Sequence, residues 1–180
     1  RKTWCGIRWC NVSCRPMKST SRGKRSERPH GRTGKPVLSL SVQYALPDEG
    51  LPTRTRLRKW AAAALRTDAA ITVRLVDAEE GRSLNHDYRK RDYATNVLTF
   101  VYQDTPPLCG DIVLCAPVVA EEARQQRKDL AAHYAHLVIH GMLHLQGYDH
   151  ENDADAAVME ALETEIVTQL GYPAPYPDRA

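Results

Sequence analysis

Three histidines late in the chain have a spacing that suits a single metal ion. His140 and His144 stand four residues apart, so on a helix their side chains lie on one face, one turn apart. Gly147 then favours a helix end, because glycine readily adopts the left-handed conformation of a C-terminal cap. The turn allows His150 to come back to the same point. This H-x3-H-x5-H pattern predicts a metal site.

The ligand chemistry favours zinc, with one ion per chain. Neutral imidazoles bind divalent transition metals well, zinc above all, although nickel also suits three histidines. Three protein ligands leave a fourth position open for water, as in catalytic rather than structural zinc sites. Zinc lowers the pKa of that water towards neutrality. The resulting hydroxide could attack a phosphodiester directly or deprotonate an RNA 2′-OH that attacks, and the residues leave both paths open.

The helix that carries these ligands is predicted over residues 130–146, which contain no proline and many Ala, Leu and His. Two further histidines, His133 and His136, lie in it. His133 precedes His140 by seven residues, about 10 Å along a helix axis, and so cannot share an ion with His144. Both are expected to be core groups or to support the ligands.

The same spacing of two histidines occurs in zincin peptidases, whose H-E-x-x-H motif has a general-base Glu directly after the first His. Here that position is Gly141. The sequence therefore keeps the geometry of a zincin helix without its base, which counts against peptide hydrolysis.

The run H-G-x-L-H-L-x-G-Y-D-H at residues 140–150 resembles the signature of the YbeY family, bacterial rRNA maturation factors regarded as metal-dependent single-strand endoribonucleases. Residues 84–100 are similar to the family's L-N-x-x-Y-R-x-K-D-x-x-T-x-V-L-S-F run, with Arg91 in place of Lys and Thr99 in place of Ser. Residues 110–112 fit its G-D-I strand. The likeness spans about residues 37–175.

This resemblance implies a zinc-dependent endoribonuclease specific for single-stranded RNA, acting in 16S rRNA 3′-end maturation and ribosome quality control. The implied partners are the rRNA precursor, the small ribosomal subunit and its assembly proteins, in the cytoplasm and without a membrane. Two alternatives stay open. One is a zincin-like metallopeptidase, and the other is a non-catalytic ribosome-assembly factor with structural zinc.

The resemblance also assigns a role to Arg89, the arginine of the family's motif. Its planar guanidinium could bind the phosphoryl oxygens, where negative charge develops. From composition alone, residues 88–91 could equally be a solvated helix end with favourable cations. Lys90 and Arg91 are expected to steer phosphates.

Four other residues are weaker candidates. Asp149 either orients an imidazole or makes an Asx turn. Thr95 and Asn96 are expected to line the site, and Tyr148 to pack.

Charge divides the chain into a basic tail and an acidic domain. Residues 1–36 hold 11 of the 25 Lys and Arg but one of the 22 Asp and Glu, a net charge of +10. The remainder therefore carries −7. The tail is expected to be disordered, either as a basic arm for RNA or, for residues 1–16 before Met17, as an extension that is not native. Cys109 and Cys115 are expected to be ordinary strand residues in a reducing cytoplasm.

Periodicity and capping signals over residues 37–180 predict a single α+β domain with about four strands and five helices. Strands are expected at 37–44, 71–76, 97–102 and 110–115. The first helix is expected to have Pro52 at its first position and to continue over residues 53–65. Further helices are expected at 78–88 after the cap Asp77, at 117–128 and at 130–146. The last helix is expected from the cap Asp153 to Leu170, with Val158, Leu162, Ile166 and Leu170 as its buried row.

Overall fold

Four strands and five helices follow one another along residues 34–176, the part of the chain that the computed structural model describes. In order they are β1 (Leu38–Tyr44), α1 (Arg54–Ala63), β2 (Ala69–Val76), α2 (Ala78–Arg89), β3 (Val97–Gln103), β4 (Leu108–Cys115), α3 (Ala116–Gln125), α4 (Leu130–Leu145) and α5 (Asp153–Gln169). This is the predicted single-domain α+β fold. The predicted tail lies outside the described residues except for 34–36, and its boundary stays a prediction.

The strands form one mixed sheet in the order β1-β2-β4-β3. β2 pairs in parallel with β1 and β4, whereas β3 pairs antiparallel with β4. Helices cover both faces, which explains why the inner strands β2 and β4 are buried along almost their whole length. All eight residues of β4 are buried, including the predicted strand residues Cys109 and Cys115. Among the described residues, no helix is long and apolar enough to cross a membrane.

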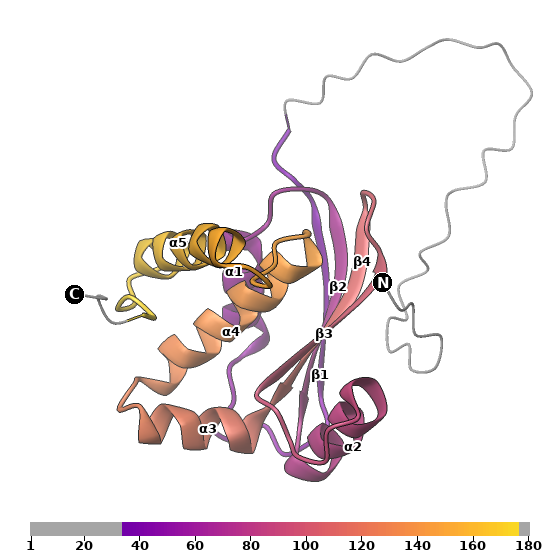
Figure 1. The fold of residues 1–180 in the computed structure, drawn as a ribbon, viewed down its shortest axis with the longest axis vertical. Coiled ribbons are helices and arrows are strands. Elements are labelled where there is room, and N and C mark those ends of the chain that lie inside the picture. Colours follow the sequence, from indigo (N-terminus) through magenta and orange to yellow (C-terminus); the bar gives the residue numbers. More distant parts are fainter. Residues whose placement is uncertain (1–33, 177–180) are drawn as a thin grey trace, which may run out of the picture.

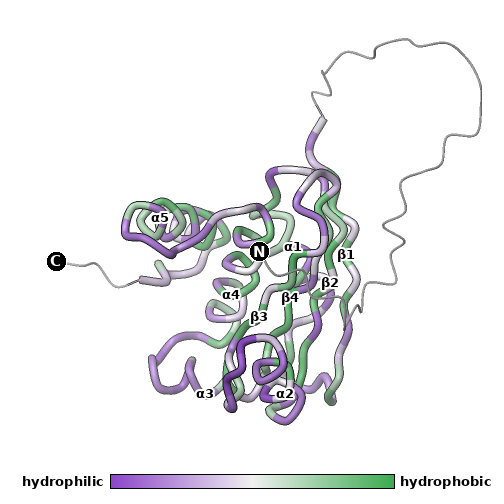
Figure 2. Tube along the Cα trace, turned by 45° about the vertical axis from the view of Figure 1, so that its right-hand side comes forward, coloured by the Kyte–Doolittle hydropathy of each residue, from purple (hydrophilic) through white to green (hydrophobic). Residues whose placement is uncertain are grey.

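The sheet separates two hydrophobic cores. The larger core lies between the sheet and α1, α4 and α5, which Figure 1 shows together on one side. The smaller core lies under α2 on the opposite face. Figure 2 shows hydrophobic residues along the strands and within α4, and hydrophilic residues on the outer turns of α2 and α3. Ten of the 16 residues of α4 are buried, and burying one large aliphatic side chain contributes about 1.5–3 kcal/mol. Packing therefore fixes α4 firmly.

Polar side chains cap the start of four of the five helices, all except α3. Asp77 accepts the backbone N–H of Glu80 at 2.9 Å and begins α2, as predicted. The predicted start of α1 is wrong by two residues. Thr53 accepts the N–H of Arg56 at 3.3 Å and so takes the cap position, which leaves Pro52 outside the helix.

Two other boundaries also differ from prediction. Asn152 rather than Asp153 caps α5, because its side chain accepts the N–H of Asp155 at 2.9 Å. The predicted helix 117–128 ends earlier, at Gln125, because Arg127 adopts a left-handed conformation with φ of 52°. The N–H of Lys128 then bonds to the carbonyl of Ala123, which closes the helix end.

The buried face of α5 matches the predicted row only in part, since Ile166 is buried and Leu162 and Leu170 pack against the larger core. Val158, in the predicted row, is 54 % exposed. The buried residues are Met159, Glu163, Ile166 and Val167. A row spaced every four residues drifts around a helix with 3.6 residues per turn, so it cannot remain on one face. The actual face brings the carboxylate of Glu163 into the interior.

The last turn of α4 approaches the sheet closely at Gly110 of β4. A Cβ at this position would overlap Cδ2 of Leu145 and lie 2.5 Å from the carbonyl oxygen of Phe100 on β3. A backbone carbonyl in a strand cannot move aside without disturbing the sheet. This close approach explains the glycine of the G-D-I run.

We expect Gly110→Ala to lower the free energy of unfolding by about 1–3 kcal/mol, since overpacking forces the backbone or Leu145 to shift. Urea denaturation measures the change. Gly34→Ala is the control, because no atom would lie within 4 Å of its Cβ. Equal stability of Gly110→Ala and the parent protein would contradict this account of the packing.

Candidate metal centre

The three predicted ligands lie together at the C-terminal end of α4. The Nε2 atoms of His140 and His144 are 3.0 Å apart. The ring of His150 lies 5.6 Å from that of His140 and 4.9 Å from that of His144, measured between centroids. One ligand atom from each of the three lies within 4.8 Å of the others. Two nitrogens on one tetrahedral zinc are about 3.3 Å apart for bonds of about 2.05 Å, so the donor set fits a single ion.

The end of α4 brings His150 to this point. Gly147 has a φ of 92°, and its N–H bonds to the carbonyl of His144 at 3.1 Å. The N–H of Tyr148 bonds to the carbonyl of Leu143, also at 3.1 Å. This pair of bonds is a Schellman motif, which reverses the chain direction. The predicted helix end at Gly147 is thus confirmed.

The three rings differ in exposure. His140 and His144 are half-buried, whereas His150 is exposed, so the site is open on one side. Burial, followed by the neighbouring imidazoles of His140 and His150, lowers the pKa of His144 to about 4. His144 is therefore neutral at physiological pH, and its lone pair is available to a metal.

The sequence analysis missed Glu163, whose carboxylate is fully buried beside the site. Its Oε1 lies 2.6 Å from Nδ1 of His140, and its Oε2 lies 3.0 Å from Nε2 of His136. The hydroxyl of Tyr176 also donates to Oε2. Burial opposes ionisation, but the hydrogen bonds from His136 and His140 outweigh it and lower the pKa of Glu163 to about 2. The signal in the sequence was a charged residue within an otherwise apolar helix face.

His136, His140 and Glu163 also lie close enough to form a second candidate metal site. The distances between their atoms are those of hydrogen bonds, and the imidazole N–H groups satisfy the carboxylate. Hydrogen bonding therefore explains why these three side chains lie close together.

The remaining candidates take structural positions. His133 is buried and pairs through Nε2 with Glu122 at 2.9 Å, so it is one of the predicted core groups, whereas His136 shares the carboxylate of Glu163 with the ligand His140. Asn96 donates to the carboxylate of Glu122 at 3.0 Å. Asp149 accepts the backbone N–H of the next residue, His150, at 2.7 Å, a contact that matches neither an Asx turn, which spans two residues, nor a bond to an imidazole ring.

The last two of the weaker candidates from the sequence are Tyr148 and Thr95. Tyr148 packs against the larger core, as predicted. Thr95 is half-buried and makes no side-chain hydrogen bond with any described residue.

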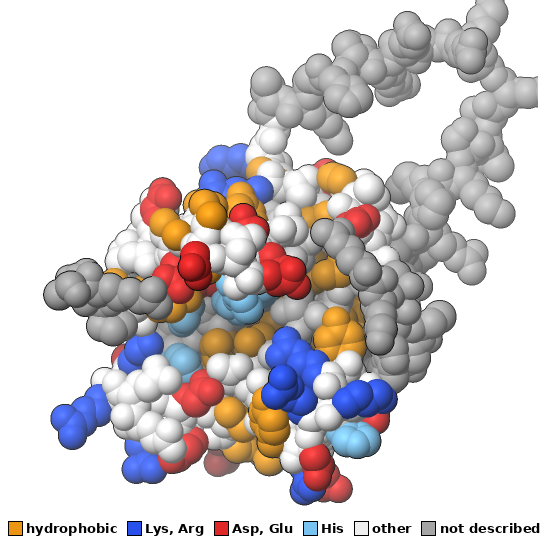
Figure 3. Space-filling view, in the orientation of Figure 1, with side chains coloured by type: hydrophobic (Ala, Val, Ile, Leu, Met, Phe, Trp, Pro, Cys, Tyr) orange, Lys and Arg blue, Asp and Glu red, His pale blue; other side chains and the backbone are white. Residues whose placement is uncertain are grey.

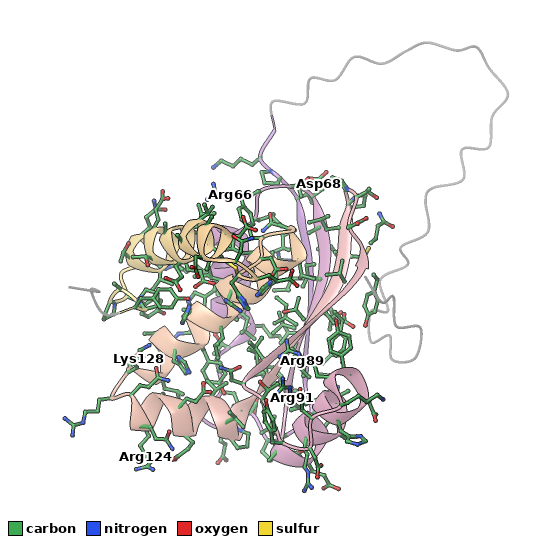
Figure 4. All side chains as sticks on the ribbon, in the orientation of Figure 1. Arg66, Asp68, Arg89, Arg91, Arg124 and Lys128 are labelled. Atoms are coloured by element: carbon green, nitrogen blue, oxygen red, sulfur yellow. The ribbon has the colours of Figure 1, made fainter. Side chains whose placement is uncertain are left out.

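Basic side chains lie on the same face as the histidines. Figure 3 shows a hollow with histidines inside it, bordered by acidic groups above and by Lys and Arg below. Figure 4, in the same orientation, places Arg89 and Arg91 near the middle of this face. Arg89 is the last residue of α2 and is exposed. Within residues 34–176 its side chain has no hydrogen-bond or ion-pair partner.

Comparison with known proteins identifies similar chains. The sequence model of the family described as Endoribonuclease YbeY matches residues 52–171. A protein of Nitrosomonas europaea named Endoribonuclease YbeY is 62 % identical over 139 residues, covering 77 % of this chain and 85 % of that one. A protein of the same name from Methylobacillus flagellatus is 57 % identical over 141 residues, covering 78 % and 95 %. A Thermotoga maritima protein solved in solution has a TM-score of 0.52 and 27 % identity, over 78 % of this chain and 98 % of that one.

We expect the purified protein to hold about one divalent ion per chain, since the described residues contain a single cluster of three convergent histidines. His144→Ala should lose most of this metal, because two imidazoles bind far more weakly than three. Elemental analysis by mass spectrometry measures the content. His86→Ala, which changes an exposed histidine on α2, is the control and should keep the full amount. Wild-type metal content in His144→Ala would show that the ligand assignment is wrong.

Proposed function

This chain belongs to the YbeY family of endoribonucleases, and on that premise we propose that it is a zinc-dependent enzyme that cuts single-stranded RNA. In this proposal His140, His144 and His150 hold the ion, and Arg89 binds the phosphate that is cut. The observation that carries the proposal is the convergence of three imidazoles at an open site.

A bound zinc ion lowers the pKa of a coordinated water towards neutrality and so supplies a nucleophile or a base at neutral pH. The protein's own residues set the conditions for this chemistry. His144 stays neutral because it is half-buried next to two other imidazoles, so it does not repel a cation. The exposure of His150 leaves room for a substrate on the solvent side. Direct attack and attack by the 2′-OH both remain compatible with this arrangement.

Arg89 provides the complementary positive charge. Either path concentrates negative charge on the phosphoryl oxygens, and a guanidinium can donate two parallel hydrogen bonds to them. Because Arg89 has no partner among the described residues, it loses no existing contact when it binds a phosphate. Exposed Lys90 and Arg91 follow it directly and would attract neighbouring phosphates of the strand.

Peptide hydrolysis is the less favoured alternative, because position 141 faces the sheet. A Cβ on Gly141 would lie 3.0 Å from Cδ1 and Cγ2 of Ile112. A glutamate here would point into the core beneath the helix and away from the open side of the site. The base of the zincin motif therefore has no place in this packing.

A purely structural zinc is also disfavoured. Structural zinc sites are closed by four protein ligands. Within residues 34–176, the cluster at the end of α4 offers three, and one of them is exposed. An open fourth position favours catalysis over a scaffolding role.

For the biological substrate we propose the 3′ end of the 16S rRNA precursor, with a role in ribosome quality control. The small ribosomal subunit and its assembly proteins would be the partners, in the cytoplasm. This part of the proposal rests on the likeness of residues 84–100 and 140–150 to the motifs of the family.

We expect Arg89→Glu to keep its zinc and its melting temperature but to lose RNA cleavage. Removing one charge-stabilising donor typically costs about 10²–10³ in rate, and reversing the charge should cost at least as much. Arg89→Lys should recover part of the activity, because an ammonium lacks the bidentate fork. Cleavage of a labelled single-stranded RNA measures the rate.

Arg56→Glu serves as the matched control, since Arg56 is an exposed arginine on α1 whose side chain has no partner among the described residues. Its rate should change little. Wild-type cleavage by Arg89→Glu, or an equal loss in both variants, would refute a specific role for Arg89.

A further inference from the structure

Besides the three histidines, the most unusual group near the site is the carboxylate of Glu163. We propose that Glu163 is a positioning residue that holds His140 in the orientation and protonation form needed to bind the metal. A segment of the chain near the C-terminus supports it through Tyr176. This inference rests on the metal centre proposed above and extends it to residues of α5 and beyond.

The direction of the hydrogen bond determines the form of His140. An ionised carboxylate can only accept, so the bond of 2.6 Å between Glu163 Oε1 and His140 Nδ1 places the proton on Nδ1. Nε2 of a neutral His140 is then unprotonated. That atom is the one that lies 3.0 Å from Nε2 of His144, where the ion would bind. The same bond increases the electron density on the ring and so strengthens its binding to a cation.

Glu163 can orient His140 because several hydrogen bonds fix its own carboxylate in place. Its second oxygen accepts hydrogen bonds from Nε2 of His136, at 3.0 Å, and from the hydroxyl of Tyr176. With three donors and no exposure to solvent, the carboxylate has one orientation in which every bond is made. A shift of Glu163 would break several bonds at once, so the ring of His140 is held rigidly.

The segment that supplies Tyr176 is itself anchored at two other points. The ring of Tyr172 packs edge-on against Trp60 of α1, with centroids 6.3 Å apart. Lys128 donates to the carbonyl oxygen of Pro175 at 2.8 Å. Residues 172–176 thus connect α1, the loop between α3 and α4, and α5, and they present the Tyr176 hydroxyl to Glu163. The metal site therefore depends on a residue that does not touch the ion.

The protein contains a second Glu–His pair involving α4, which allows an experiment to separate a positioning role from a stabilising one. Glu122 of α3 bonds to Nε2 of His133 at 2.9 Å, which is the same chemistry on the same helix. His133 is two turns away from His140 and is not a proposed ligand. Loss of either carboxylate should disturb α4 in a similar way, but only the loss of Glu163 should affect the metal.

The test compares Glu163→Gln with Glu122→Gln. Zn²⁺ affinity is measured by competition with a chromophoric chelator, and the geometry of the site is followed by the visible absorption spectrum of the Co²⁺-substituted protein. We expect Glu163→Gln to bind Zn²⁺ about 10- to 100-fold more weakly, as is typical when a group that orients a ligand is lost. Its Co²⁺ spectrum should change, while Glu122→Gln should match the parent protein in both measurements.

Tyr176→Phe is the second variant, in case Glu163→Gln does not fold. It removes one hydrogen bond and should weaken Zn²⁺ binding roughly 2- to 10-fold, whereas Tyr172→Phe should leave Zn²⁺ binding unchanged.

His144→Ala distinguishes a failure of the proposed metal centre from a failure of the proposed positioning role. If it binds Zn²⁺ like the parent, the metal centre itself is wrong. If it loses Zn²⁺ while Glu163→Gln and Tyr176→Phe keep full affinity, or if Glu122→Gln loses as much as Glu163→Gln, the positioning role is overturned.

Discussion

The close contact between α4 and β4 is the constraint on which the rest of the site depends. Two glycines permit it. Gly110 lies against Leu145 with no room for a Cβ, and Gly141 lies so close to Ile112 that a Cβ there would make a tight contact at 3.0 Å. One face of α4 is therefore fixed by the sheet. His140 and His144, which lie away from this contact, are consequently held at a defined height above the sheet, with the Schellman turn directing His150 towards them.

Placing histidines on α4 where their side chains are buried or half-buried costs free energy, which carboxylates from neighbouring helices offset. An unpaired buried polar group costs about 1–3 kcal/mol. Glu122 of α3 binds His133, and Glu163 of α5 binds His136 and His140. Both α3 and α5 thus contribute one carboxylate to α4. The packing of α3, α4 and α5 is specified by these pairs as well as by hydrophobic contact. A rotation of α5 would leave the buried carboxylate of Glu163 without its partners, and a rotation of α3 would break the bond of the half-buried Glu122 to His133.

Local features of the chain predicted the elements well. Cap residues such as Asp77 act within one turn of helix, and the Gly147 signal needs nothing beyond the helix that it ends. The three ligands could be found for the same reason, since helical spacing and one turn bring them together. The start of α5 was predicted one residue too late, at the cap Asp153 instead of Asn152, because both side chains are good caps and their positions are adjacent.

Contacts between different helices could not be predicted from these local signals. Nothing local indicates that Glu163 meets His140, since the two lie 23 residues apart and the rotation of α5 decides the contact. The position of Tyr176 depends in addition on the path that residues 172–176 take after α5. A charged residue on the buried face of α5 could have indicated that Glu163 needs a partner, but the identity of that partner required the packed structure.

The most direct test of the account is metal-dependent cleavage of RNA by the full chain. The protein is stripped with a chelator, freed of it, and divided into samples with and without added Zn²⁺. Each sample is then incubated with a labelled 16S rRNA precursor, and a fully paired duplex is the reference substrate. The account predicts cuts in single-stranded regions by the Zn²⁺-loaded protein, none by the stripped protein, and little cutting of the duplex. Equal cleavage with and without metal, or no cleavage by the loaded protein, would contradict the central claim.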